Sequence, residues 1–233
     1  MTRRAGGLMV SELFGPTVQG EGPSTGQLAS FARLSGCPLS CRWCDTPWTW
    51  DWTRYDRSAE QHPMTIGEVT AWAGRQPARL IVITGGEPLV QARQLTELVP
   101  ALAALGKDVE IETSGIIAPP SALAANGAKF NVSPKLSNAA MPESRRIRGH
   151  ALRALASSGA ARFKFVAQRL SDLAEIAALE AAYGLDPVWV MPQGTTSTAV
   201  MSGMRLLADE VIARGWHLSP RLHVLLWEDT RGR

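Results

Sequence analysis

Three cysteines form the densest group of reactive side chains in the 233-residue sequence. Cys37, Cys41 and Cys44 are its only cysteines, and all fall in one short segment, SGCPLSCRWCDTPW (35–48). A closed structural zinc site needs four ligands; of the histidines only His62 is near, and none has a conventional spacing. A transient disulfide leaves the third thiol unexplained. Three thiolates on a [4Fe–4S] cluster leave one iron open for a small molecule, which gives the absence of a fourth cysteine a positive reason.

A second motif follows about 40 residues later in the chain. The apolar run LIVI (80–83) is followed by TGGEP (84–88), and the aromatic Trp43 precedes the last cysteine. A CxxxCxxC motif after a first strand, combined with GGEP after the next, resembles the radical S-adenosylmethionine (SAM) superfamily. An activating enzyme that acts on a partner protein is an alternative within this superfamily, and a zinc-stabilised binding module is an alternative outside it.

Three further stretches narrow the resemblance. They are ELFGPTVQGEGPSTGQLASFARLSGC (12–37), CDTPWTWDW (44–52) and NVSPK (131–135). Together they resemble the 7-carboxy-7-deazaguanine synthase family over residues 8 to about 228. The Gln-Gly-Glu-Gly segment argues against the activating enzyme, which has no pterin to recognise.

The resemblance implies a complete reaction. A lyase of this family converts 6-carboxy-5,6,7,8-tetrahydropterin to 7-carboxy-7-deazaguanine with loss of ammonia, for queuosine-type 7-deazapurine synthesis. The implied cofactors are a [4Fe–4S] cluster, SAM and Mg²⁺. The implied partners are a small-molecule pterin and an electron donor such as flavodoxin or ferredoxin. A homodimer of modified TIM-like barrels is the implied assembly.

The resemblance also implies roles for individual residues at the cofactors. Cys37, Cys41 and Cys44 would bind three irons, and Thr46 would bind Mg²⁺ with Asp45 beside it. Magnesium prefers oxygen ligands and keeps waters, so one hydroxyl, a substrate carboxylate and water would suffice. The residues expected at SAM are Trp43, Gly85, Gly86, Glu87, Glu112, Ser114, Ser133, Lys135 and Gln193.

A third set is expected at the substrate, comprising Val18, Gln19, Gly20, Glu21, Arg33, Thr84 and His223. An amide and a carboxylate complement the donors and acceptor of an amino-pyrimidinone edge. Arg33 interrupts the apolar segment ASFARL (29–34). A buried arginine without an anionic partner is costly, so the sequence itself favours a ligand carboxylate beside it. The polar C-terminus leaves open whether Arg233 approaches the site.

The elements that position these residues alternate between strands and helices. Short apolar runs at 29–34, 80–83, 109–111, 129–132, 163–166 and 188–191 predict strands. Helical spacing joins Leu95 to Leu105, Val200 to Val211, Ile66 to Trp72 and Leu173 to Ala177, and Gly106, Gly159 and Gly184 are expected C-terminal caps. Polar residues follow each strand, where the ends of parallel strands converge. We expect one α/β domain over residues 1–233, an incomplete, modified (β/α) TIM-like barrel with mostly parallel strands.

Composition is consistent with this reading. The net charge of +3 fits an enzyme with an anionic substrate as well as it fits nucleic-acid binding, but the sequence has no basic run that would follow phosphates. The cluster Arg145, Arg146 and Arg148 is interpreted as a solvated helix start. No stretch is apolar enough for a membrane helix or a signal peptide, and three clustered thiols fit a reducing cytoplasm.

Overall fold

One curved sheet organises the molecule. The computed structural model describes residues 7–233, and in that range the strand order is β3-β1-β2-β4-β5-β6-β7-β8-β9. The strands are β1 (Leu8–Val18), β2 (Leu28–Leu34), β3 (His62–Met64), β4 (Leu80–Gly85), β5 (Asp108–Thr113), β6 (Lys129–Val132), β7 (Ala161–Ala167), β8 (Val188–Pro192) and β9 (His217–Leu218). All pairs from β2 to β9 are parallel, whereas β1 is antiparallel to both of its neighbours.

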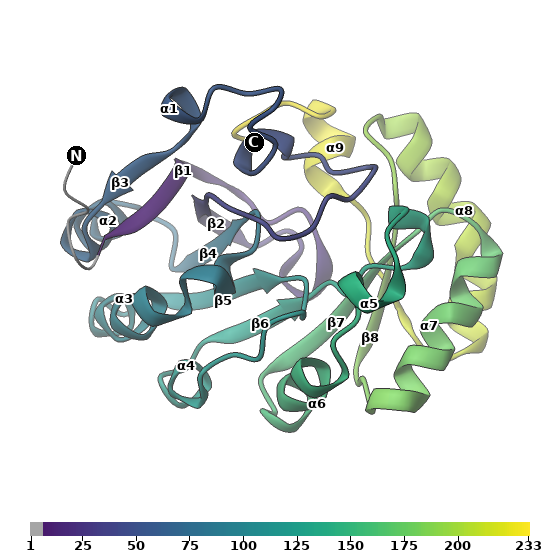
Figure 1. Cartoon of the computed structure of the whole chain (residues 1–233). Helices are drawn as coiled ribbons and strands as arrows, with labels where there is room; N and C mark the ends of the chain where they lie inside the picture. The colour runs from purple at the N-terminus through teal and green to yellow at the C-terminus, as the bar shows by residue number, and fades with distance from the viewer. Residues whose placement is uncertain (1–6) are drawn as a thin grey trace.

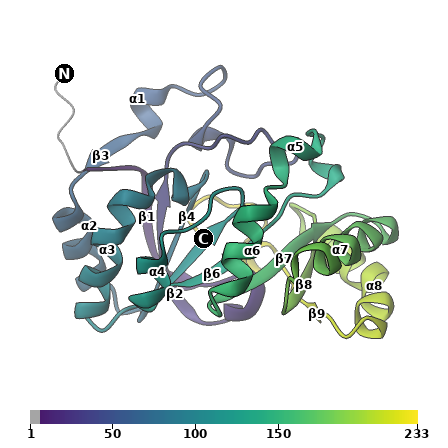
Figure 2. The ribbon, with the colours of Figure 1, turned by 60° about the horizontal axis from the view of Figure 1, so that its bottom comes forward.

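Helices line the outer side of this sheet. The α-helices of residues 7–233 are α1 (Arg57–Glu60), α2 (Ile66–Gly74), α3 (Ala92–Ala104), α4 (Ser121–Ala125), α5 (Glu143–Arg146), α6 (Gly149–Ser157), α7 (Leu170–Tyr183), α8 (Ser197–Ala213) and α9 (Leu222–Trp227). Figure 1 shows α2, α3, α4, α6, α7 and α8 around the outside, while the dark-blue chain after β2 and the yellow chain with α9 lie at the other side. Figure 2 shows the outer helices from below. The sheet is open between its edge strands β3 and β9, so the predicted incomplete, mostly parallel α/β barrel is confirmed.

The core lies between the sheet and the outer helices. Alternate residues of each strand, such as Ile81 and Ile83, are fully buried against Leu95 and Leu98 of α3. Aliphatic burial of this kind stabilises by roughly 25 cal/mol per Å² of apolar area removed from water. The other face of the sheet carries a smaller apolar cluster of Ala29, Phe31, Leu80 and Val82, together with polar side chains such as Thr84 and Glu112.

All six predicted strands are present, extended by a few residues at most. The four predicted helices correspond to α2, α3, α7 and α8. Gly106 and Gly184 follow their helices with φ of +72° and +66°, the left-handed geometry that favours glycine at a helix end. The confirmed alternation shows that apolar periodicity was sufficient to locate these elements.

β1 is the main element that the periodicity did not predict. Its sequence LMVSELFGPTV contains Gly15-Pro16, and its pairing with β2 shifts register between Val10 and Glu12 and between Phe14 and Thr17. Proline cannot donate to the ladder, and a bulge breaks the two-residue alternation. The cysteine loop therefore follows the second strand of the chain rather than the first.

The interpretation of the arginine cluster as a solvated helix start is wrong for Arg146. Arg145 and Arg148 are exposed, but Arg146 is buried at the end of α5. Its Nη1 donates to Glu175 at 2.6 Å and to the carbonyl oxygen of Lys135 at 2.8 Å. The cost of removing this guanidinium from water is offset because each of its hydrogen bonds goes to an acceptor.

Within residues 7–233, no helix has both the length and the apolar character needed to cross a membrane.

Candidate active site

A cavity of about 280 Å³ opens where the strands end. Side chains reach it from β1, β2 and β4 to β8, from the cysteine loop and from the C-terminal segment. The predicted site residues that line it are Val18, Gln19, Gly20, Glu21, Arg33, Cys37, Cys41, Trp43, Cys44, Thr46, Thr84, Gly85, Gly86, Glu112, Ser114, Ser133, Lys135, Gln193 and His223. The fold thus brings both expected sets, for cofactor and for substrate, to one cavity.

Glu87 is the exception, since it does not line the cavity. It is fully buried, and its carboxylate accepts from Thr113 Oγ1 at 2.7 Å, Ser114 N at 2.8 Å and Leu89 N at 3.0 Å. These bonds occupy the carboxylate inside the protein. Glu87 therefore holds the end of β5 against the end of β4, and its side chain does not face a ligand.

The two glycines before Glu87 have a packing role. A Cβ on Gly86 would lie 2.3 Å from the carbonyl oxygen of Gly36 and 2.9 Å from Cys37 Cβ. Gly85 has φ of +140°, and a Cβ there would lie 2.0 Å from the carbonyl oxygen of Leu34. Both glycines therefore let the loop after β4 pack directly on the start of the cysteine loop.

The three thiols share one wall of the cavity. All three cysteines are half-buried, and burial raises the pKa of Cys37 to about 12 and that of Cys41 above its usual value. Trp50 Nε1 donates to Cys44 Sγ at 3.3 Å. Buried thiols without a metal disfavour the charged form, whereas irons would stabilise three thiolates in this position.

The surroundings of the thiols fit an iron–sulfur cluster. Leu39, Ala139 and Met141 pack around Cys37 and Cys41 and shield them from water. Within residues 7–233, no three His, Cys, Asp or Glu side chains converge on a site for a single metal ion. Three thiols with an apolar backing and an open cavity in front are the donor set that a cluster with one free iron requires.

Thr46 lies next to the last cysteine and faces the cavity. Its Oγ1 is 3.8 Å from Cys44 Sγ. Thr46 precedes the short helix Pro47–Thr49, but its side chain makes no capping hydrogen bond there. The hydroxyl therefore remains available to a ligand.

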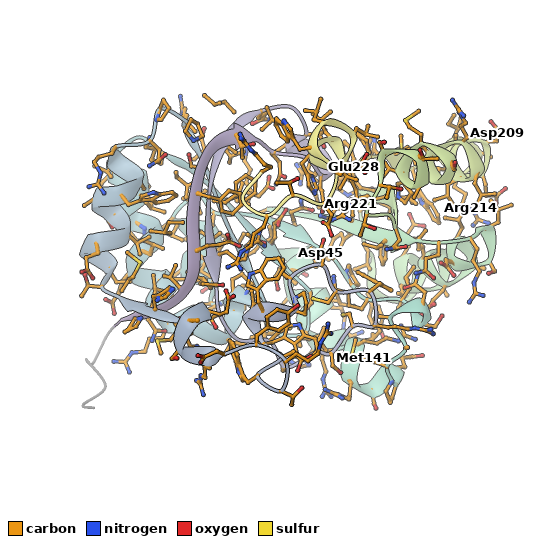
Figure 3. All side chains as sticks on the ribbon, turned by 90° about the horizontal axis from the view of Figure 1, so that it is seen from above. Asp45, Met141, Asp209, Arg214, Arg221 and Glu228 are labelled. Carbon is orange, nitrogen blue, oxygen red and sulfur yellow. The ribbon has the colours of Figure 1, made fainter. Side chains whose placement is uncertain are left out.

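Glu21 is the centre of a buried ion-pair network on the side of the cavity that holds the residues expected at the substrate. It accepts from Lys164 Nζ and, at 2.9 Å, from Arg221 Nε. Burial alone would raise the pKa of Glu21, but the two cations hold it well below its usual range. Arg221 also donates to Asp45, and Figure 3 shows these two side chains close together, far from Asp209 on α8. The network ties the end of β1 to the cysteine loop.

Gln19 and Glu112 form a second polar group beside this network. Gln19 Nε2 donates to Glu110 and to Glu112, both at 3.1 Å. Glu112 also accepts from Thr84 Oγ1 at 2.7 Å and lies 3.9 Å from Lys164 Nζ. The contacts place Glu112 with the residues expected at the substrate, although it was expected at SAM.

His223 closes this side of the cavity. A Cβ on Gly20 would lie 2.0 Å from His223 Nδ1, so only glycine permits this approach. Burial lowers the pKa of His223, and the carboxylate of Glu21 opposes that shift without reversing it. His223 is therefore a neutral imidazole at pH 7, able to donate from one nitrogen and accept at the other.

Arg33 also lines the cavity, but its burial is not an argument for a ligand. Its Nε donates to Glu12 Oε1 at 2.7 Å. The inference that the buried arginine lacked an anionic partner is therefore wrong, because β1 supplies one. Arg33 remains a candidate for a substrate carboxylate only because it faces the cavity.

Several residues at the site were not predicted. Lys164 interrupts the apolar run FKFV (163–166) just as Arg33 interrupts ASFARL, so the same signal could have found it. Asn131 interrupts the apolar run KFNV (129–132) in the same way, whereas Arg221 carries no such signal, since its neighbours are mixed in polarity. The C-terminal residues 229–233 also line the cavity, so Arg233 does approach the site.

Comparison with known proteins agrees with this geometry. The Radical SAM superfamily model matches residues 33–154. The 7-carboxy-7-deazaguanine synthase of Pyrobaculum aerophilum is 37% identical over 228 residues, covering 96% of each chain. The chain belongs to the 7-carboxy-7-deazaguanine synthase family. The family member from Escherichia coli is 31% identical, covering 93% of this chain and 97% of its own.

Solved structures place the fold in the same family. The crystal structure of QueE from Escherichia coli superimposes with a TM-score of 0.71 at 29% identity, covering 91% of this chain and 93% of that one. Streptococcus suis SuiB bound to S-adenosylmethionine, at 14% identity and a TM-score of 0.53, shares the fold alone. A 7-carboxy-7-deazaguanine synthase of the radical SAM superfamily uses a [4Fe–4S] cluster, SAM and Mg²⁺, and the three cysteines are present here.

Proposed function

We propose that the chain converts 6-carboxy-5,6,7,8-tetrahydropterin to 7-carboxy-7-deazaguanine with loss of ammonia. The observation that carries the proposal is a single cavity lined both by the three-cysteine loop and by the polar residues Glu21, Glu112 and Lys164. A radical source and a binding site for a polar heterocycle are thus next to each other. The activating-enzyme alternative is not favoured, because the family members above are named for the deazaguanine product.

The residues fall into two groups by position. Cys37, Cys41 and Cys44 would hold the cluster, while the backbone at Gly85 and Gly86 borders the SAM side. Further contacts to SAM are proposed for Trp43, Ser114, Ser133, Lys135 and Gln193. The cluster and SAM, when bound, would supply one-electron cleavage of SAM and hydrogen abstraction from the substrate.

The protein's own side chains would orient the substrate. Arg33 would pair with its carboxylate through its terminal nitrogens, and the Thr46 hydroxyl would contribute to the Mg²⁺ site. Glu21 and Glu112 are acceptors for the N–H groups of the pyrimidinone edge, and His223 can complete the set. The ion pairs of Glu21 with Lys164 and Arg221 fix its carboxylate before substrate arrives, which reduces the entropy lost on binding.

Assembly and cellular context are further parts of this proposal. We expect one radical SAM domain over residues 1–233, a homodimer, and a cytoplasmic enzyme reduced by flavodoxin or ferredoxin. Light scattering of the purified chain tests the dimer. Replacing a chemical reductant by each electron carrier in turn tests the donor.

The function is tested under anaerobic conditions. Reconstituted, reduced protein is mixed with SAM, Mg²⁺ and the carboxytetrahydropterin, and the product is identified by mass spectrometry. We expect 7-carboxy-7-deazaguanine and four irons per chain. Cleavage of SAM without any pterin product would reject the proposed substrate. A colourless folded protein that binds zinc would reject the cluster as well.

A further inference from the structure

A buried acceptor in the cavity wall lacks a partner within the described chain. Asn131 lies on β6, is 1% exposed and lines the cavity. Its Oδ1 makes no hydrogen bond to any of residues 7–233. An acceptor that is buried and unpaired is unfavourable, and such groups in native proteins have an explanation. Because this one lies at a cavity, a ligand donor is the explanation that the geometry favours.

The other end of the same amide is held in place. Asn131 Nδ2 donates to Glu110 Oε1 at 3.4 Å, and this oxygen also accepts from Gln19 Nε2 at 3.1 Å. Ser24 Oγ donates to Glu110 Oε2 at 2.5 Å. Since a carboxylate oxygen only accepts, the amide nitrogen belongs on the Glu110 side. The carbonyl oxygen of Asn131 is then directed away from Glu110.

The loop after β1 packs on this amide and limits its movement. Gly22 has φ of +67°, and a Cβ there would lie 2.8 Å from Asn131 Nδ2 and 3.2 Å from Oδ1. Any side chain at Gly22 would therefore displace the amide. Asn131 is thus held from two sides, which is how a recognition group is pre-organised.

The neighbouring strand presents a second acceptor. Asn131 is the register partner of Glu112 on β5, and the Glu112 side chain is 21% exposed at the same cavity. Two adjacent strands therefore place two acceptors side by side. Their chemical complement is a planar heterocycle that carries neighbouring N–H donors along one edge.

We propose that Asn131 Oδ1 accepts a hydrogen bond from the amino-pyrimidinone edge of the substrate and that Asn131 is a specificity-determining residue. This inference rests on the proposed function and deepens it by naming the substrate edge that is read. Glu110 is the positioning residue that orients the amide. A ligand whose edge lacks the 2-amino group loses one of the two donors that this pair of strands accepts.

The test compares two ligands and two variants. Asn131→Leu keeps the side-chain size and removes both polar atoms, while Asn131→Ser removes the amide and serves if the leucine variant does not fold. Dissociation constants are measured anaerobically, with SAM present, for the carboxytetrahydropterin and for its analogue lacking the 2-amino group. Iron content and melting temperature report on the fold. Asn126→Ala, directly after α4 and outside the cavity, is the matched control.

We expect either variant to weaken binding of the true substrate about tenfold and to weaken the analogue far less. The control should bind both ligands as the parent does. An equal loss for the two ligands would assign Asn131 to packing and overturn the proposal, as would unchanged substrate binding by a variant with intact iron. If the parent protein cleaves SAM but does not bind the carboxytetrahydropterin, the proposed function fails, and this inference fails with it.

Discussion

Glu12 joins two arginines that approach the cavity from opposite ends of the chain. Its Oε1 accepts from Arg33 Nε at 2.7 Å, and its Oε2 lies 3.4 Å from Arg231 Nε. Arg231 also donates to Glu60 at 2.7 Å and lies over the Trp48 ring at 4.5 Å. Within residues 7–233 the terminal nitrogens of Arg33 have no acceptor, so its single bond to Glu12 orients the guanidinium and leaves both terminal nitrogens for a ligand.

Substitution of Arg33 tests this arrangement. We expect Arg33→Ala to weaken carboxytetrahydropterin binding by about 30-fold, because a charge-assisted hydrogen bond contributes roughly 2 kcal/mol. Iron content should not change, since the cysteine loop is untouched. Titration of substrate into the reconstituted protein measures the effect. Arg79→Ala removes an exposed arginine from the other end of β4 and should bind normally; unchanged binding by the Arg33 variant would reject the carboxylate contact.

Gly86 provides a test of the cysteine loop. A Cβ at this position meets the backbone carbonyl of Gly36, which cannot move aside as a flexible side chain can. We expect Gly86→Ala to lower the iron bound per chain after reconstitution by about half or more, with far-ultraviolet circular dichroism largely preserved. Gly67, in α2, is the control, because a Cβ there would have only Thr65 Oγ1 within reach, at 4.0 Å. The Gly67→Ala variant should bind as much iron as the parent. Full iron in the Gly86 variant would show that the loop can adjust.

The network around Glu21 predicts how stability depends on pH. The folded-state pKa of Glu21 lies well below the usual value because of Lys164 and Arg221, although burial opposes this. A depressed carboxyl pKa contributes stability that is complete above the unfolded-state pKa of about 4.5 and is lost as pH falls through the folded value. We therefore expect Glu21→Gln to cost about 3 kcal/mol at pH 7, and less as the pH approaches 3. Urea unfolding between pH 3 and pH 7 measures the free energy of unfolding of the parent and of the Glu21→Gln variant. A difference between the two that does not change with pH would contradict this linkage.

Arg146 is expected to act on the cavity through the backbone of Lys135. Replacing Arg146 by methionine leaves the Lys135 carbonyl and Glu175 without their donor. The expected cost is about 3 kcal/mol of unfolding free energy, with a higher KM for SAM because the Lys135 side chain lines the cavity. Arg148→Met, two residues away and exposed, is the control. A fall in stability with an unchanged KM would limit Arg146 to a structural role.

The sequence was sufficient for the strands whose apolar residues alternate without interruption, and for motifs close together in the chain. It was insufficient for β1, where Gly15-Pro16 and two register shifts break the pattern. Glu12 therefore could not be recognised as the partner of Arg33, and the rule about buried charge was applied to an arginine that already has an anionic partner. The internal bonds of the Glu87 side chain could not be foreseen for a related reason, since Thr113 and Ser114 follow a strand that only the folded sheet places beside β4.

The contact between Gly86 and Gly36 has a consequence for protein engineering. No atom larger than hydrogen fits between the two backbones, so the GGEP turn and the start of the cysteine loop cannot change position independently of each other. Swapping either loop alone for that of another radical enzyme would misalign the other. Libraries intended to reshape the part of the cavity beside these two loops should therefore exchange residues 34–37 and 84–87 as a single cassette.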